Sequence, residues 1–180
     1  MTERIMVDIE TLGTDPGAAI VSIGAVQFTT DADPGDAIEA EFFESVALES
    51  CDAYGLDIDG STVEWWLGQP AAAREQLHGG RDLSTALRSL RSFVDDADEI
   101  WANSPAFDCA ILREAYRAVD QPTPWRYWQE RDFRTLRKVL PDWPAREQAG
   151  VEHDALDDAR YQAECLVRAL NALDDGGGRS

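Results

Sequence analysis

The stretch Ile5-Met6-Val7-Asp8-Ile9-Glu10-Thr11 decides how the rest of the chain is interpreted. Its apolar residues predict a buried strand over residues 5–9, and Asp8 and Glu10 stand one residue apart where that strand should end. Because alternate side chains of an extended chain point to the same face, the two carboxylates would aim at one point. Neighbouring anions repel each other, and the simplest compensation is a hard divalent metal ion bound through oxygen. The stretch therefore predicts a metal site built on a buried strand.

Composition predicts one folded domain. The 180 residues are 44% hydrophobic, which is too apolar for a disordered protein. We expect a single domain over residues 1–173 and a disordered tail over residues 174–180, where glycines cluster. No apolar run approaches the length of a membrane span and no signal-peptide pattern opens the chain, so a cytoplasmic protein that does not bind membranes is expected. Cys51, Cys109 and Cys165 are widely spaced and odd in number, which predicts reduced, structural thiols.

The net charge is the unusual bulk property. Asp and Glu total 35 against 16 Lys and Arg, for a net charge of -19. Lys138 is the one lysine in the sequence. A solvated acidic surface explains the charge in part, but the near absence of lysine favours a halophilic adaptation to a salt-rich cytoplasm. General nucleic-acid binders are basic, so any nucleic acid would have to be held locally by metal ions and a few arginines.

The pattern along the chain is that of an α/β domain on one mixed sheet. The expected strands cover residues 5–9, 19–28, 40–46, 99–102 and 125–128, the first three as a meander. Ser61 and Glu64 form a capping-box pattern for a short helix that ends by Pro70. Further helices are expected over residues 71–77, after Asp82, from Asp108, over residues 132–140 and after the cap Asp154.

Three segments carry the candidate chemistry: Asp8-x-Glu10, Asp108 after a short strand, and His153 with Asp158 at the start of the last helix. In an open α/β sheet such junctions gather on one rim, so four carboxylates could share two divalent ions. Each element has a structural alternative, because an isolated aspartate near a helix start is more often a cap and an isolated histidine is more often a surface residue. The spacing of the whole set favours a site.

The set resembles the DEDDh family of 3′-5′ exonucleases in the DnaQ-like superfamily, which have an RNase H-like fold. Asp8 and Glu10 match the first motif, Asp108 the second, and His153 with Asp158 the third, in its histidine form. The stretch Ser61-Thr62-Val63-Glu64-Trp65-Trp66-Leu67 points to a narrower group, similar to a mycobacterial exoribonuclease and to phage exonuclease A. The resemblance covers almost the whole chain and implies a central mixed five-stranded sheet flanked by helices.

The resemblance also implies a mechanism. Asp8, Glu10, Asp108 and Asp158 would hold two Mg²⁺ ions, or Mn²⁺, and His153 would act as general base. The enzyme would release nucleoside 5′-monophosphates from the 3′ ends of single strands or overhangs, with RNA favoured over DNA. Members of the family often form homodimers. The alternatives are a DNA-directed exonuclease of the proofreading or phage type, and a non-catalytic acidic module that binds a protein partner.

Substrate contacts follow from the same motifs. Thr11 and Leu12 correspond to residues that touch and wedge the 3′-terminal nucleotide in the family, and Asn103 and Phe107 precede the second motif. Trp65 and Trp66 are adjacent and face different sides of their helix, so one could pack in the core while the other stacks on a base. The pattern does not say which, and core packing of both stays open. Arg131 and Arg134 could reach phosphate, although exposed arginines more often form ion pairs.

Overall fold

A mixed five-stranded sheet forms the centre of the protein. The computed structural model describes residues 2–140, 150 and 153–177. The strands are β1 Arg4–Thr11, β2 Ile20–Phe28, β3 Ile38–Ser45, β4 Glu99–Ala102 and β5 Glu130–Asp132, in the order β3-β2-β1-β4-β5. The pairs β1–β2 and β2–β3 are antiparallel, whereas β1–β4 and β4–β5 are parallel. The predicted α/β fold with a mixed five-stranded sheet is therefore confirmed.

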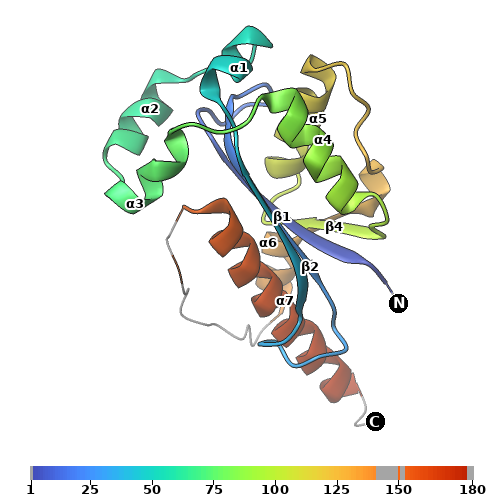
Figure 1. The fold of residues 1–180 in the computed structure, drawn as a ribbon. Coiled ribbons are helices and arrows are strands. Elements are labelled where there is room, and N and C mark those ends of the chain that lie inside the picture. The colour runs from blue at the N-terminus through green and yellow to red at the C-terminus, as the bar shows by residue number, and fades with distance from the viewer. Residues whose placement is uncertain (1, 141–149, 151–152, 178–180) are drawn as a thin grey trace.

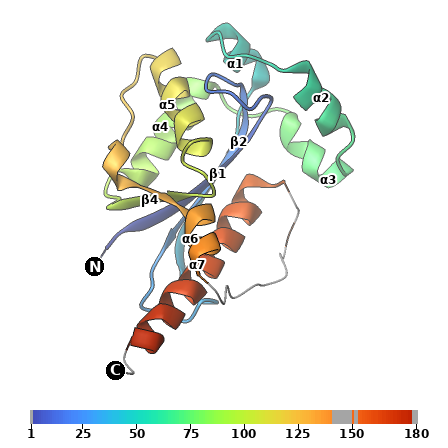
Figure 2. The same cartoon turned by 180° about the vertical axis from the view of Figure 1, so that it is seen from behind.

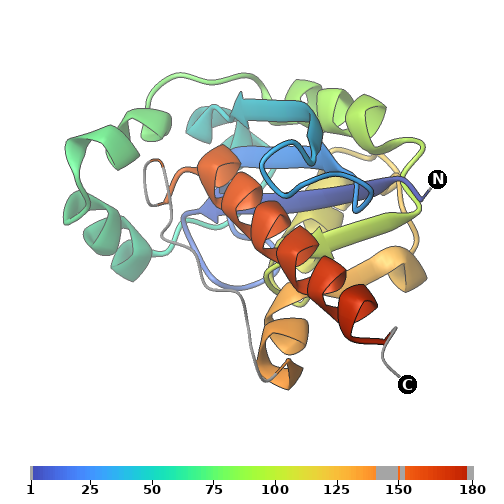
Figure 3. The same cartoon turned by 90° about the horizontal axis from the view of Figure 1, so that it is seen from below.

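Helices cover both faces of this sheet. They are α1 Leu48–Ala53, α2 Gly60–Leu67, α3 Ala71–Arg74, the 3₁₀ turn η1 Glu75–Leu77, α4 Leu83–Val94, α5 Asp108–Ala118, the 3₁₀ turn η2 Tyr127–Gln129, α6 Phe133–Val139 and α7 Ala155–Gly177. Helices α4 and α5 lie on one face, and α6 and α7 lie on the other (Figures 1 and 2). Seen from below, α7 runs along the sheet, and its first turn lies near α2 and α3 (Figure 3). Among the described helices, none is both long and apolar enough to span a membrane.

The alternation of side chains along β1 assigns each residue to one of two cores. Ile5, Val7 and Ile9 pack into the core beneath α4 and α5. Met6 points the other way, into the core beneath α7. Asp8 and Glu10 follow Met6 at steps of two, so they project from the face that α7 covers. Where apolar packing under α7 ends, the strand presents carboxylates instead.

Gly24 lets the start of α7 lie directly on the sheet. It pairs with Asp8 across β1 and β2. A Cβ atom added at Gly24 would stand 2.2 Å from the carbonyl carbon and oxygen of Ala155 and 2.4 Å from the nitrogen of Leu156. No side chain fits in that space, because real Cβ atoms do not approach a backbone so closely. Glycine at this position therefore brings the backbone of α7 into contact with the strand that lies beside Asp8.

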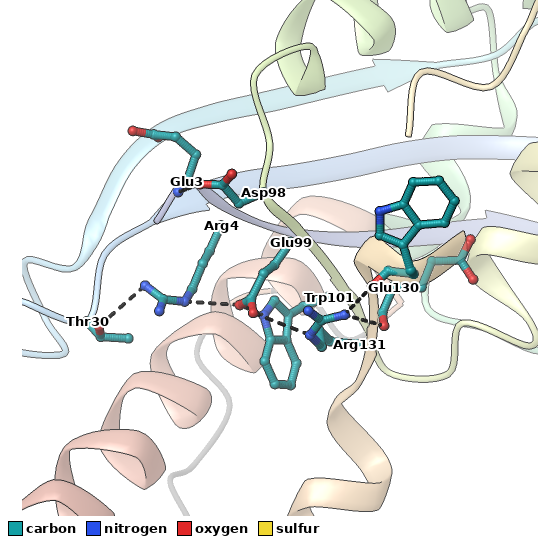
Figure 4. A network of polar contacts seen from close by, with 9 residues as sticks. Glu3, Arg4, Thr30, Asp98, Glu99, Trp101, Glu130 and Arg131 are labelled. Atoms are coloured by element: carbon teal, nitrogen blue, oxygen red, sulfur yellow. Dashed lines mark hydrogen bonds and ion pairs between the residues drawn. The ribbon is translucent and has the colours of Figure 1, made fainter. Parts of the chain in front are cut away.

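The amino ends of β1 and β4 are tied to β5 by a polar network (Figure 4). Glu99 accepts from Arg4 at 3.2 Å and forms an ion pair with Arg131 at 3.3 Å. The indole nitrogen of Trp101 donates to the same carboxylate at 3.0 Å. These contacts join three neighbouring strands at the end of the sheet opposite the carboxylates of β1. The network fixes the strands and leaves their carboxyl ends for the site.

Four local predictions need correction. The strand expected over residues 125–128 is wrong, because η2 occupies residues 127–129 and β5 follows it. As a three-residue edge strand with polar side chains, β5 lacks the apolar pattern that identifies buried strands. Ser61 is not the cap of α2: Asp59 accepts from the Thr62 backbone N–H at 2.9 Å. Helix α1 was not predicted, and α7 continues to Gly177, past the expected start of the tail at residue 174. Residues 178–180 lie outside the described part.

Several other predictions are confirmed. Asp82 and Asp154 accept backbone N–H groups at the starts of α4 and α7. The stripe of α4 is buried from Leu83 to Leu90. All three cysteines are buried thiols, as expected for structural residues.

Candidate active site

The structure brings the five motif residues together from three elements. Asp8 and Glu10 come from β1, Asp108 is the first residue of α5, and Asp158 lies in the first turn of α7. Both Asp108 and Asp158 interact electrostatically with Asp8 and with Glu10. One ligand atom from each of Glu10, His153 and Asp158 lies within 4.8 Å of the others. Segments about 150 positions apart in the sequence thus form one cluster.

Burial and mutual repulsion raise the pKa values of the cluster. The pKa of Asp8 is well above its ordinary value because the group is desolvated and faces Asp108, Glu10 and Asp158. The pKa of Glu10 is raised to about 8, mainly by desolvation and then by the negative charges of Asp158 and Asp108. Burial raises the pKa of Asp108 to about 7, although backbone N–H groups and the Arg134 charge act in the opposite direction. Carboxylates that repel one another in a dry setting are a donor set suited to hard divalent cations.

Gln162 is a member of the site that the sequence analysis missed. Its Nε2 donates to Asp8 Oδ1 at 2.7 Å, and the side chain is buried. Gln162 follows Asp158 by four positions on α7, so the two side chains share the helix face that looks onto β1. This four-residue spacing from Asp158 is the feature of the sequence that could have identified Gln162 as part of the site. The bond holds Asp8 in one orientation.

His153 is held at the start of α7 by contacts on several sides. It immediately precedes the cap Asp154, whose carboxylate accepts from the backbone of Leu156 and Asp157, each at 3.1 Å. Its φ is 65°, in the left-handed region. Its imidazole centroid lies 4.8 Å from the ring of Trp65, nearly perpendicular to it. The ring therefore stands between the aromatic wall of α2 and the carboxylates.

A pocket of about 460 Å³ opens beside the carboxylates. Its lining consists of Glu10, Thr11, Gly13, Thr14, Ser61, Thr62, Trp65 and Phe107. The predicted contacts Thr11, Trp65 and Phe107 thus lie at the pocket, and Trp65 is 43% exposed. Sequence reasoning missed the other small and polar residues of the wall, because loop residues of this kind carry no distinctive pattern.

Three predicted substrate residues do not line this pocket. Leu12 is buried in the core beneath α4 and α5. Trp66 is 1% exposed, and its indole nitrogen donates to the carbonyl of Thr11 at 2.9 Å. Of the two tryptophans, Trp66 is therefore the core residue and Trp65 faces the pocket. Asn103 is exposed, and its backbone carbonyl accepts from the Arg134 N–H at 3.2 Å.

Comparison with solved structures identifies the same fold in several nucleases. The nuclease domain of 3′hExo, a DEDDh family member bound to rAMP, matches with a TM-score of 0.65 and 13% identity, covering 94% of this chain and 92% of that one. E. coli exonuclease I in complex with a dT13 oligonucleotide matches with a TM-score of 0.63 and 17% identity over 97% of this chain. The chain spans 43% of the length of exonuclease I. S. pombe Pop2p, in a Mg²⁺- and Mn²⁺-bound form, matches with a TM-score of 0.60 and 12% identity over 96% of this chain and 84% of that one. The predicted RNase H-like, DEDDh-type fold is confirmed.

Comparison of sequences narrows the assignment. The exodeoxyribonuclease of Enterobacteria phage T4 is 24% identical over 165 residues, which cover 75% of this chain and 70% of the phage protein. The model of the Rv2179c-like 3′-5′ exoribonuclease domain matches residues 3–170. The match covers most of the chain, including all five motif residues. The chain belongs to the Rv2179c-like 3′-5′ exoribonuclease domain family.

Proposed function

We propose that this protein is a metal-dependent 3′-5′ exoribonuclease that releases nucleoside 5′-monophosphates from single-stranded 3′ ends. The observation that carries the proposal is the convergence of Asp8, Glu10, Asp108, Asp158 and His153 beside an open pocket. Family membership supports RNA as the substrate.

The four carboxylates would hold two divalent cations, Mg²⁺ or Mn²⁺. Once bound, such ions supply neutralisation of the carboxylates, polarisation of the scissile phosphate and an activated water. The chain itself contributes the geometry: β1 fixes Asp8 and Glu10 on one face, and the bond from Gln162 orients Asp8. Burial keeps bulk water from screening the charges.

His153 is suited to accept the proton of the attacking water. Its imidazole lies with Glu10 and Asp158, where the reacting phosphate would be held, and it is only half-buried. A neutral imidazole is an effective base near pH 7, and general-base catalysis contributes about 10²–10⁴-fold to a rate. His153 would therefore govern turnover more than metal binding.

The pocket would receive the terminal nucleotide. Its volume of about 460 Å³ falls within the range of small-ligand sites. Trp65 offers a half-exposed indole on which a base can stack, and Thr11 and Phe107 form neighbouring walls. Asn103 lies outside the pocket, directly after the last residue of β4. It would contact the 3′ end of the bound nucleic-acid strand.

Helix α6 offers a way for an acidic protein to hold a polyanion. It carries Arg134, Arg137 and Lys138, all exposed, and no acidic residue. The three positions share one helix face, since they are three and four residues apart. Arg134 is close enough to Asp108 to act on its charge. The upstream phosphates of a bound strand would follow this face away from the pocket.

The test is digestion of matched RNA and DNA oligonucleotides that carry a 5′ label and overhangs of varied length. We expect stepwise shortening from the 3′ end and free 5′-monophosphates with Mg²⁺ or Mn²⁺, abolished by EDTA. Asp8→Asn and Asp108→Asn should each lower kcat by at least about 10²-fold, whereas the exposed Asp95→Asn should not. If neither polymer is shortened with either ion at low or high salt, the chain is instead a non-catalytic acidic module.

DNA is the second candidate substrate. The phage T4 relative is an exodeoxyribonuclease, and exonuclease I was solved with a DNA oligonucleotide. The matched substrates decide between the two, since a higher kcat/KM on DNA would replace the proposal for RNA. The expected homodimer stays a prediction, which light scattering would test.

A further inference from the structure

Gln76 lies outside the pocket but connects three segments around the site. Its side chain belongs to η1 and is 7% exposed. The amide nitrogen donates to the carbonyl of Ala73 at 3.0 Å and to the carbonyl of His153. The amide oxygen accepts from the hydroxyl of Ser22 on β2. Both N–H groups and the oxygen are therefore used, so the amide has one orientation.

The backbone of His153 is in a conformation that needs such support. A φ of 65° is unfavourable for a residue other than glycine, because the Cβ atom comes too close to the following carbonyl oxygen. Strain of this kind persists when surrounding contacts determine the conformation. Gln76 holds the carbonyl of His153, while Trp65 contacts its ring at 4.8 Å. Both contacts come from the segment that comprises α2, α3 and η1.

The amide oxygen of Gln76 is bound to the sheet through Ser22. Ser22 is fully buried and stands opposite Glu10 in the pairing of β1 and β2. A chain of two hydrogen bonds thus runs from β2, beside Glu10, to the backbone of His153. The amide side chain of Gln76 therefore links the backbone of His153 directly to the strand that lies beside Glu10.

We infer that Gln76 is a positioning residue that holds His153 in its left-handed conformation and so keeps the imidazole at the carboxylate cluster. The inference rests on the proposed function, in which His153 is the base. Without the donor, His153 would relax to a conformation with negative φ, and its side chain would leave the vicinity of Glu10 and Asp158. A displacement of about 1 Å at a reacting group can cost about 10²-fold in rate.

A double-mutant cycle with His153→Ala tests whether Gln76 acts through the histidine. Gln76→Leu should lower kcat by about 10- to 100-fold, with KM and Mn²⁺ affinity within about twofold of the original protein. In the His153→Ala background the same substitution should change kcat by less than about twofold. Costs that multiply in the double variant would show that Gln76 acts on the fold or on another group, and would overturn the inference.

Two companion variants separate positioning from stability. Gln76→Glu keeps an acceptor for Ser22 but replaces the donors with an oxygen that faces two carbonyls, so it should lose kcat as Gln76→Leu does. If Gln76→Leu does not fold, Gln76→Glu replaces it in the double-mutant cycle. The matched control is Gln69→Leu. The Gln69 amide donates a hydrogen bond to the carbonyl of Trp65 in the preceding helix, so this substitution also removes an amide donor but should leave kcat unchanged.

A second readout does not depend on turnover. The chain has two histidines, so His78→Gln leaves the imidazole of His153 as a single side chain to follow by NMR. Its ring resonances should be displaced by Trp65 and should move to random-coil positions on Gln76→Leu or Gln76→Glu. Unchanged resonances would refute the inference even if the protein proved to have no nuclease activity, whereas absent activity with the expected shift would refute the proposed function alone.

Discussion

At the scale of single residues, the chemistry of Asp8, Glu10 and Asp108 depends on their surroundings. Each is an ordinary carboxylic acid, but each is taken out of water and set beside the others. Without a cation, part of the cluster must be protonated near neutral pH. Protons and metal ions therefore compete for the same oxygens.

This competition predicts how the stability of the metal-free protein changes with pH. The pKa of Glu10 rises from 4.5 to about 8 and that of Asp108 from 3.8 to about 7. At pH values between the unfolded and the native pKa of each group, the native state binds protons that the unfolded state has released. The free energy of unfolding therefore falls as pH rises through this range. In EDTA, the Tm should therefore increase when pH is lowered from about 8 to about 5, and saturating Mg²⁺ should flatten the curve.

The matched control for this prediction is the double variant Glu10→Gln and Asp108→Asn. Removing both groups should leave a shallower slope, to which the buried Asp8 and the rest of the acidic surface still contribute. Scanning calorimetry of both proteins in EDTA supplies the comparison. Equal slopes would mean that the raised pKa values do not contribute.

Trp65 should contribute to substrate affinity. Trp65→Ala removes a stacking surface worth about 1–3 kcal/mol per base, so KM for an oligonucleotide should rise by at least about fivefold. Trp65→Phe should retain most of the affinity, because a smaller ring still stacks. Leu67→Ala is the control, since Leu67 is exposed on the same helix but does not line the pocket. An unchanged KM in Trp65→Ala would remove the stacking role.

At the scale of elements, the site depends on how closely α7 approaches β2. Gly24→Ala places a Cβ within 2.4 Å of the backbone of α7, so the start of the helix must move. The shift would carry Asp158 and His153 away from Asp8. We expect a loss of about 1–3 kcal/mol in stability and a drop in kcat and metal affinity larger than the destabilisation explains.

Gly35→Ala provides the control for Gly24→Ala, because nothing lies within 4 Å of its added Cβ. Thermal unfolding, Mn²⁺ titration and turnover should be measured on both. If Gly24→Ala kept the original metal affinity and kcat, close approach of the helix would not be needed for the site.

Helix α6 makes a second prediction at this scale. Arg137→Gln with Lys138→Gln should weaken binding of a dodecanucleotide and reduce the slope of log K against log salt by about 1.4, since each contact to a single strand contributes about 0.7. Arg88→Gln with Arg91→Gln removes two charges from α4, on the other face of the sheet, and should leave the slope unchanged. Equal slopes for all three proteins would exclude α6 from the path of the strand.

At the scale of the whole molecule, the net charge of -19 opposes both compaction and binding of nucleic acid. Salt shortens the range of that repulsion to about 3 Å at 1 M. If the composition reflects adaptation to a salt-rich cytoplasm, as we propose, the Tm should rise steadily as KCl is raised into the molar range. Sucrose at matched osmolality is the control for solvent exclusion. A maximal Tm in dilute buffer would contradict the proposal.

Local patterns in the amino-acid sequence predict a large part of this structure. The alternation in β1 predicts that Asp8 and Glu10 share a face, since the period of a strand is local geometry. The stripe and cap of α7 place Asp158 on its inner face for the same kind of reason. Four of the five strands, most of the helices and the candidate ligands follow from such local patterns together with the spacing of the motifs, whereas β5 and α1 do not.

Other features of the site depend on contacts between distant segments, so no local pattern predicts them. Trp65 and Trp66 are equivalent by pattern, and only the packing of α2 against β1 buries one and exposes the other. Gln76 and Gln162 are ordinary polar residues in the sequence, and they gain their roles from partners 77 and 154 positions away. Long-range packing, which no local period records, therefore determines how the site is oriented.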